Sequence, residues 1–297
     1  MPTRVDSVAR IGAAIAALIL LGFLLTRWIS PFVGGDVVYD AESEFGRVRV
    51  VDGADGVRSL YVGPGRARQT AIVPGRPRHL VSEYARVAMI GLALTPAGGR
   101  ILYVGLGGGA MPTYTRAVFP SARIEVVEID PVIVDVARRY FDVRPDSNLV
   151  VHTGDGRAFI EGAAQGTYDL IVLDAFSDDA IPIALATREF LAAVRTALAA
   201  DGVVVSNLWS SSPLYPSMLA TYDAIFDEVH SIRVGRTIQR IIIAGDTVDG
   251  MNQEDLEAAA GRLTSRVDLG FDLSDLVRSG YEGVAGATAP VLSDSDS

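Results

Sequence analysis

Between residues 100 and 244, short apolar runs alternate with longer stretches that have helical spacing. The short runs predict buried strands at 101–104, 124–127, 149–152, 170–173 and 203–207. Stretches such as 132–140 and 188–199 have apolar positions at helical intervals and predict helices between the strands. Strands that alternate with helices form a parallel sheet with both faces covered, so we expect an α/β, doubly wound domain.

Two further apolar runs, at 229–234 and 238–244, predict a hairpin that ends this domain. A seventh, antiparallel strand beside the sixth fits the architecture of class I methyltransferases, so the expected core is a Rossmann-like, seven-stranded sheet. After Asp246 the pattern predicts one helix at 253–264 and a disordered tail rich in Ser and Asp.

Short β-rich runs at 37–39, 47–51 and 58–62, separated by Asp-Gly turn signals, predict a small antiparallel sheet ahead of this domain. An amphipathic helical stretch follows at 76–95 and ends at Pro96. We therefore divide the chain into an N-terminal segment at 1–35, a small β domain at 36–75, a Rossmann-like domain at 76–246, and a C-terminal helix with a flexible tail at 247–297.

The N-terminal segment has the pattern of a membrane anchor. Residues 11–29 are uncharged up to Arg27, and a helix of this length is roughly 28 Å long, which matches one hydrocarbon core. A cleaved signal peptide would need a small-residue cleavage site after the apolar run, and a buried helix would show a polar stripe. The segment has neither feature, so we expect one transmembrane helix.

Composition excludes several kinds of chemistry. The chain has no cysteine, and all 26 of its Lys and Arg residues are arginine. This excludes disulfides, thiolate metal sites, cysteine nucleophiles, a Walker P-loop and a Schiff-base lysine. Three widely spaced histidines argue against a metal centre, and the net charge of −10 argues against a nucleic-acid partner. The remaining class is an acidic α/β protein that acts on small molecules.

A glycine-rich turn follows the first predicted strand. Gly105, Gly107 and Gly109 let the backbone approach a ligand closely, and the helix that comes next offers unpaired N–H groups. Taken alone, this turn also fits a dinucleotide-binding fingerprint or a tight turn without any ligand.

Acidic residues follow the next two strands. Glu128 ends the second strand, where a carboxylate can accept hydrogen bonds from both ribose hydroxyls of a nucleoside. Asp155 and Gly156 follow the third strand, where an acidic group can meet an adenine amino group. The alternative role for Asp155 is to cap the next helix. Three ligand-suited loops at one edge of the sheet are a stronger signal than any single one.

The fourth predicted strand ends in a further carboxylate. Asp174 lies where the reacting end of a bound nucleoside would be, and it could take a proton from an amine nucleophile or simply bind the cation. Asp178 and Asp179 could extend this acidic mouth, or they could be solvated loop residues or helix caps.

Together these motifs resemble the polyamine aminopropyltransferases (spermidine synthases), especially their bacterial membrane-associated relatives. The resemblance covers residues 40–245. It is carried by 42–47, Gln69, the glycine turn at 105–109, 127–130, 154–156, 174–176, 181–182 and 187–190.

The resemblance implies a co-substrate, decarboxylated S-adenosylmethionine or S-adenosylmethionine, and a small-molecule amine as acceptor. It implies that Asp174 deprotonates the acceptor, and that Gln69, Glu128 and Asp155 contact the nucleoside. We also place Tyr84 and Asp178 on the substrate side. A second copy of the chain is a possible partner.

Three departures from the family pattern affect the part that binds cations. Gly108 stands where these enzymes carry an aspartate for the donor's amino group. Their Tyr-His-Glu motif is reduced to Tyr84-Ala-Arg86, in which Arg86 adds a repelling charge. Their Asp-Ser-Ser-Asp loop has become Asp174-Ala-Phe-Ser, with the next acid moved to Asp178.

The leading hypothesis is therefore aminopropyl transfer to an amine. A methyltransferase that uses S-adenosylmethionine has the same expected fold, and a membrane-tethered sensor that binds the nucleoside without turnover belongs to a different class. An NAD-dependent oxidoreductase is disfavoured because no second catalytic half follows the five-strand unit.

The location of the main domain is weakly indicated. Arg4 and Arg10 precede the apolar run and Arg27 ends it, which favours a main domain outside the cytoplasm. The inferred ligand is a cytoplasmic metabolite, and this argument outweighs the arginine distribution. We therefore predict a single-pass protein of the cell membrane with residues 36–297 on the cytoplasmic face.

Overall fold

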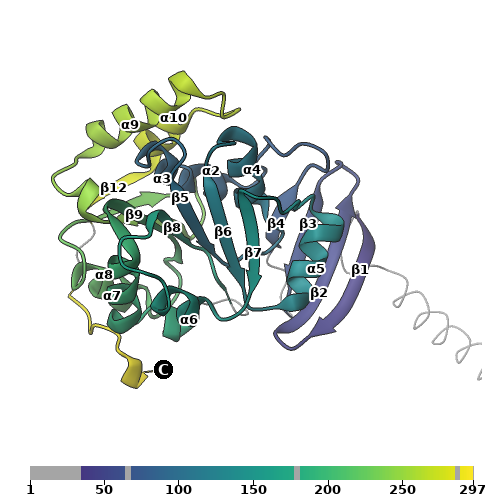
Figure 1. Ribbon diagram of the computed structural model, residues 1–297, viewed down its shortest axis with the longest axis horizontal. Coiled ribbons are helices and arrows are strands. Elements are labelled where there is room, and N and C mark those ends of the chain that lie inside the picture. Colours follow the sequence, from purple (N-terminus) through teal and green to yellow (C-terminus); the bar gives the residue numbers. More distant parts are fainter. Residues whose placement is uncertain (1–34, 64–67, 177–180, 285–287, 297) are drawn as a thin grey trace, which may run out of the picture.

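The computed structural model describes residues 35–63, 68–176, 181–284 and 288–296. A small antiparallel sheet lies at one end of the molecule (Figure 1) and has the strand order β1-β2-β3-β4. Its strands are β1 (Gly35–Ser43), β2 (Gly46–Gly53), β3 (Arg58–Val62) and β4 (Arg68–Ile72). The predicted small antiparallel sheet is thus present, and it has a fourth strand that includes Gln69.

The large sheet has the order β12-β10-β11-β9-β8-β5-β6-β7. Its strands are β5 (Arg100–Val104), β6 (Arg123–Glu128), β7 (Leu149–Thr153), β8 (Tyr168–Leu173), β9 (Leu198–Trp209), β10 (Val229–Arg233), β11 (Gln239–Ala244) and β12 (Tyr281–Val284). The five strands from β5 to β9 are parallel, and the three others pair in antiparallel fashion. This is the Rossmann-like, methyltransferase-type arrangement that the sequence predicted, and its terminal hairpin places β11 between β9 and β10.

Helices cover both faces of the large sheet (Figure 1). They are α2 (Glu83–Ala88), α3 (Ile90–Ala93), α4 (Ala110–Val118), α5 (Pro131–Tyr140), α6 (Gly156–Glu161), α7 (Arg188–Ala197), α8 (Tyr215–Asp223), α9 (Gln253–Arg266) and α10 (Leu273–Gly280). Short 3₁₀ turns are η1 (Ile183–Leu185), η2 (Asp246–Val248) and η3 (Asp294–Asp296). The stretch expected as one helix at 76–95 in fact begins with turns and irregular backbone at 76–82, which are followed by α2 and α3.

Alternation along β5 explains the two layers. Ile101 and Tyr103 belong to a core that also holds buried residues of α2, α3, α9 and α10, whereas Leu102 and Val104 belong to a core with α6, α7 and α8. Successive strand residues point to opposite faces, so a strand that is buried on both faces reads as one continuous apolar run. This is why the five parallel strands are visible in the sequence.

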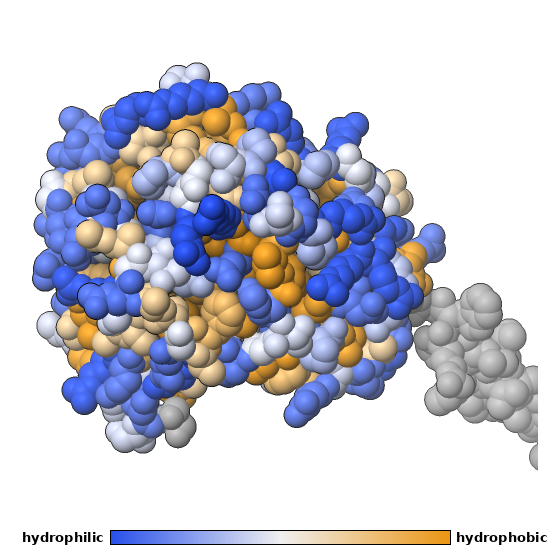
Figure 2. Space-filling view, in the orientation of Figure 1, coloured by the Kyte–Doolittle hydropathy of each residue, from blue (hydrophilic) through white to orange (hydrophobic). Residues whose placement is uncertain are grey.

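Helix α5 joins the two sheets. Val134 and Ala137 pack in the large-sheet core, and Ile133 and Val136 pack against Val48 and other residues of the small sheet. Two apolar faces on one helix hold the small sheet beside the carboxyl ends of β5 and β6. The face of the molecule in Figure 2 is mostly hydrophilic, with apolar side chains reaching the surface near its middle.

The C-terminal part differs from the prediction. The large sheet has eight strands rather than seven, because Tyr281–Val284 adds β12 to the edge of β10. A second helix, α10, precedes β12. In the expected flexible tail, Leu292 is only 6% exposed and packs in the core beneath α7 and α8. An apolar side chain among Ser and Asp residues therefore anchors a segment whose composition is typical of disorder.

The expected single-pass membrane location is not upheld. In the part of the chain that the structure describes, we find no helix that is both long enough and apolar enough to cross a membrane. This finding contradicts the predicted single-pass location. The anchor predicted at 11–29 lies outside the described residues.

Candidate active site

A cavity of about 280 Å³ lies at the carboxyl ends of β5, β6 and β7, beside the small sheet. Three predicted ligand loops meet in its wall: Gly105 and Gly107 after β5, Glu128 at the end of β6, and Asp155 with Gly156 after β7. Apolar surface comes from Phe45 in the turn between β1 and β2, Val62 of β3, Ile129 and Ile133. The cavity therefore combines apolar walls with a few polar groups, as small-molecule sites do.

The glycine turn has a backbone that other residues rarely adopt. Gly105, Gly107 and Gly109 have φ angles of +96°, +50° and +70°. A Cβ on Gly105 would lie 2.4 Å from the carbonyl oxygen of Asp174, so the turn also requires the missing side chain for space. Gly109 is the N-cap of α4, and the turn thus leads the chain directly from the cavity wall into that helix.

Glu128 is held by backbone donors. Its Oε2 accepts hydrogen bonds from the N–H groups of Leu106 (2.9 Å) and Gly107 (3.3 Å), and its Oε1 accepts from the N–H of Asp130 (3.0 Å). Burial raises the pKa of this carboxyl, and the three N–H groups oppose that effect. The carboxylate fixes the glycine turn, and Glu128 also lines the cavity.

Asp155 caps a helix and also lies in the cavity wall. Its Oδ1 accepts a hydrogen bond from the N–H of Ala158 at 2.7 Å and caps α6, and the residue also lines the cavity. Gly156 is needed for packing, because a Cβ there would lie 2.6 Å from Cγ1 of Val104.

Asp174 lies between this cavity and a second one. The second cavity has a volume of about 60 Å³, and Asp174, Gln69, Gly105, Gly107 and Phe176 line both. A carboxylate shared by two adjoining cavities can contact ligands in each of them. Asp174 thus lies in the wall that the two cavities share.

Two donors hold the Asp174 carboxylate. Asn207 Nδ2 donates to Oδ1 at 3.0 Å, and the Tyr84 hydroxyl donates to Oδ2 at 3.3 Å. Burial raises the pKa of Asp174 despite these hydrogen bonds. The Tyr84 hydroxyl also lies 3.4 Å from the carbonyl oxygen of Gln69, and burial together with Asp174 raises the pKa of Tyr84 well above its usual range. Tyr84 is therefore a neutral donor that orients the carboxylate.

The second cavity contains residues that the sequence did not single out. Arg68, Asn207 and Trp209 line it, and the indole ring of Trp209 packs against Phe176 with ring centres 5.1 Å apart. Trp209 Nε1 is buried and has no hydrogen-bond partner among the described residues. Their position along the chain could have identified two of them. Asn207 and Trp209 lie at the end of the fifth parallel strand, at the same sheet edge as the other candidate site residues.

The charge expected from Arg86 comes from another arginine. Arg86 Nε donates to the carbonyl oxygen of Leu80 at 2.7 Å, and Arg86 does not line either cavity. Arg68 does line the second cavity, and its charge slightly offsets the rise in the Tyr84 pKa. A positive charge near the expected acceptor cavity is therefore present, but on β4 rather than on α2.

Thr70 fills the space that a side chain at position 108 would occupy. The Thr70 hydroxyl accepts a hydrogen bond from the Gly108 N–H at 2.9 Å. A Cβ on Gly108 would lie 2.7 Å from Thr70 Cγ2 and 2.8 Å from Phe141 Cδ1. An aspartate at this position, as the family resemblance leads one to expect, could not be accommodated without repacking.

Asp178 and Asp179 lie outside the described residues. Among the residues that are described, no group of three or more His, Cys, Asp or Glu side chains could hold a metal ion.

Comparison with known proteins identifies the family. Residues 81–231 match the family model described as "Spermine/spermidine synthase domain". The chain is 34% identical over 258 residues to the polyamine aminopropyltransferase of Vibrio vulnificus (strain CMCP6), which covers 85% of this chain and 86% of that protein.

Solved structures agree on the fold. A probable spermidine synthase from Corynebacterium glutamicum superposes with a TM-score of 0.66 at 23% identity, covering 78% of this chain and 88% of that one. Human methyltransferase-like protein 13 in complex with SAH gives a TM-score of 0.57 at 27% identity, covering 66% of this chain and 93% of that one. On the family match and the near full-length relative, this chain belongs to the spermine/spermidine synthase domain family of transferases.

Proposed function

We propose that the chain transfers the aminopropyl group of decarboxylated S-adenosylmethionine to an amine acceptor. The observation that carries this proposal is the position of Asp174 in the wall shared by a larger and a smaller cavity. The larger cavity suits a nucleoside and the smaller one suits an amine. Transfer between two ligands requires such adjacent sites with one basic group between them.

The larger cavity would hold the donor. Glu128 would accept from the ribose hydroxyls, since its carboxylate lies in the wall and is already oriented by backbone N–H groups. Asp155, at the far end, would accept from the adenine amino group. Gln69, together with Gly105 and Gly107, lies where the two cavities join, next to the expected position of the sulfonium.

The reaction would proceed by direct displacement. The acceptor nitrogen attacks the carbon of the aminopropyl group next to sulfur, and the carbon–sulfur bond breaks as the carbon–nitrogen bond forms. The sulfur keeps the electron pair and leaves as the neutral thioether methylthioadenosine. Asp174 takes a proton from the acceptor amine, which is mostly protonated at neutral pH. Positioning supplies most of the catalysis, and proton removal adds about 10²–10⁴-fold.

The environment of Asp174 suits a base. Burial raises its pKa toward the range in which it can accept a proton from an ammonium group, while Asn207 and Tyr84 keep the carboxylate in one orientation. A buried carboxylate also attracts the cationic acceptor into the smaller cavity.

Methyl transfer from S-adenosylmethionine is the second candidate, and one feature favours it. The space for a donor-binding aspartate at Gly108 is filled by Thr70, and Arg68 lines the smaller cavity. A carboxylate-bearing donor would meet a complementary charge there. The 27% identity to a methyltransferase-like protein over 66% of the chain supports this alternative.

Transfer assays with both donors test the proposal. The parent chain and Asp174→Asn are incubated with either donor and a panel of amines that includes 1,4-diaminobutane. We expect methylthioadenosine and an aminopropylated amine from the decarboxylated donor, and a loss of about 10²–10⁴-fold in Asp174→Asn.

Product from S-adenosylmethionine alone would instead establish methyl transfer. Tight nucleoside binding without any product across the panel would mean that the chain is a binding protein rather than an enzyme. Equal turnover by the parent and Asp174→Asn would remove Asp174 from the mechanism.

A further inference from the structure

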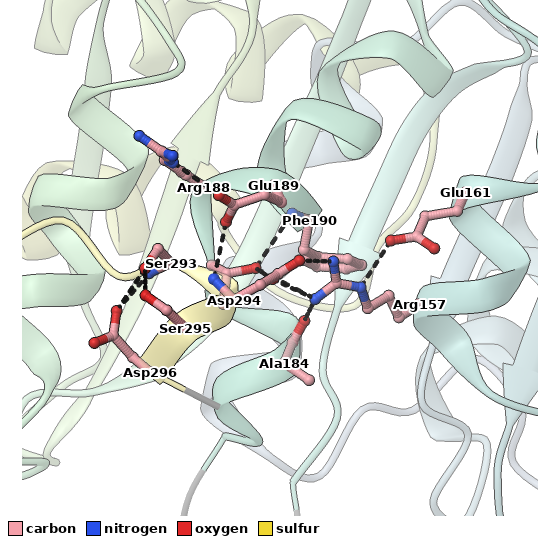
Figure 3. A network of polar contacts seen from close by, with 11 residues as sticks. Arg157, Glu161, Ala184, Arg188, Glu189, Phe190, Ser293, Asp294, Ser295 and Asp296 are labelled. Atoms are coloured by element: carbon pink, nitrogen blue, oxygen red, sulfur yellow. Dashed lines mark hydrogen bonds and ion pairs between the residues drawn. The ribbon is translucent and has the colours of Figure 1, made fainter.

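A polar network ties the C-terminal segment to the wall of the larger cavity (Figure 3). The guanidinium of Arg157 is at its centre. Arg157 Nη1 and Nη2 donate to the two carboxylate oxygens of Asp294 at 2.8 and 2.7 Å, a bidentate pair between residues that are 137 positions apart. Bidentate arginine–carboxylate pairs fix orientation as well as distance.

The same guanidinium contacts both sides of the cavity. Arg157 is the second residue of α6, and its Nη1 also donates to the carbonyl oxygen of Ala184 in η1 at 3.2 Å. Asp155, Gly156 and Arg157 form one part of the cavity wall, and Pro182, Ala184 and Leu185 form another. Arg157 thus connects the two wall segments that would enclose the adenine end of the donor.

Asp294 holds this connection from outside the cavity. Its Oδ1 also accepts from the hydroxyl of Thr187, the N-cap of α7, at 2.8 Å. Arg157 and Thr187 lower the pKa of Asp294, so the carboxylate is ionised at neutral pH. Asp294 does not line either cavity.

The chain around Asp294 is firmly attached. The N–H of Leu292 donates to the Thr221 hydroxyl at 3.0 Å, and its carbonyl oxygen accepts from the N–H of Arg188 at 2.9 Å. The Leu292 side chain is buried in the core. Asp294 is therefore presented to Arg157 in a defined position, although it lies outside the residues 81–231 that match the family model.

We propose that Asp294 is a positioning residue for donor binding, which acts through Arg157 to hold η1 and the start of α6 at the spacing that the nucleoside needs. The inference rests on the proposed function in one respect, namely that the larger cavity binds the nucleoside. It concerns the ground-state affinity for the donor rather than the transfer step.

Nucleoside binding by full-length variants tests this role. Dissociation constants for methylthioadenosine are measured by calorimetry for the parent chain, Asp294→Asn and Asp296→Asn. Asp296 is the matched control, because it lies in the same turn but its carboxylate accepts from Ser293. We expect roughly tenfold weaker binding for Asp294→Asn and a change of less than about twofold for Asp296→Asn.

Two further readouts separate positioning from a general loss of structure. The KM for the donor should rise in Asp294→Asn while kcat stays unchanged, because the residue touches no reacting atom. In an Arg157→Met background, Asp294→Asn should have no further effect on affinity, because the two residues act as one unit. Asp294→Glu, which keeps the charge, should recover part of the affinity.

These experiments distinguish failure of the positioning role from failure of the proposed function. A parent chain that binds the nucleoside no more tightly than Asp294→Asn does would overturn the positioning role and leave the proposed function intact. Additive losses in Asp294→Asn and Arg157→Met would likewise refute action through Arg157. A parent chain that binds no nucleoside would overturn the proposed function and this inference together.

Discussion

Replacing Glu128 with alanine perturbs the larger cavity at its best-defined polar group. The side chain accepts hydrogen bonds from three backbone N–H groups at 2.9, 3.3 and 3.0 Å, and it lies in the cavity wall. Removing it takes away the proposed ribose contacts and also releases the glycine turn at Leu106 and Gly107. Both effects weaken nucleoside binding, and both follow from one carboxylate.

The magnitude follows from the number of bonds lost. Each hydrogen bond to a charged group contributes about 1.5–3 kcal/mol. Two ribose hydroxyls bonded at the lower value give about 3 kcal/mol, which corresponds to a loss of affinity of roughly 100-fold. The exposed N–H groups of the turn can bind water in the opened cavity, so we expect little more than this from the turn itself.

The assay is calorimetric titration with methylthioadenosine, with Glu125→Gln as the control. Glu125 lies on the same strand, and its carboxylate contacts Tyr168 (3.0 Å) and His152 (3.2 Å) rather than the cavity. We expect Glu125→Gln to lower the unfolding temperature without changing the dissociation constant. Unchanged affinity in Glu128→Ala, or equal losses in both variants, would refute the assignment of the ribose site.

Two further predictions concern Asp174 and Gly108. Burial raises the pKa of Asp174, so on acidification kcat/KM should begin to fall at a higher pH than it would with an ordinary aspartate. The residual activity of Asp174→Asn should not show this fall. The pKa of Asp174 is higher in the folded state than in the unfolded state, so its ionisation costs stability at neutral pH. Asp174→Asn should therefore unfold at a higher temperature than the parent at neutral pH. A lower unfolding temperature would contradict this reasoning. Gly108→Ala should lose about 1–3 kcal/mol of stability, measured by urea unfolding, because the added methyl group overlaps Thr70 and Phe141. Adding Thr70→Ser should restore part of this loss. No recovery in the double variant would show that the overlap with Thr70 is not the cause.

The amino-acid pattern by itself was sufficient to predict the parallel sheet and to place the candidate site residues at one edge of it. Strands such as β5 are buried on both faces, which produces continuous apolar runs, and the carboxyl ends of parallel strands necessarily meet at one edge. The pattern alone therefore brings Gly105, Glu128, Asp155 and Asp174 together. The family resemblance rested on these same positions, and the comparisons confirm the family.

Tertiary packing decided which other side chains enter the site. Leu173 and Ser206 are paired across β8 and β9, and this register brings Asn207 to Asp174 although 33 positions separate them. The direction of an arginine is likewise not encoded locally. Arg86 turns back to bond the carbonyl oxygen of Leu80, and Arg68 takes the place by the cavity that the motif pattern assigns to Arg86.

The C-terminal segment shows the same limit most clearly. Its composition is typical of a disordered tail, because few apolar residues mean little burial to offset chain entropy. β12 forms only because the edge of β10 is available to pair with it, and Leu292 is ordered only because α7 and α8 leave space for it. Contacts of this kind depend on surfaces made by distant parts of the chain, so only the folded structure could place Asp294 beside Arg157.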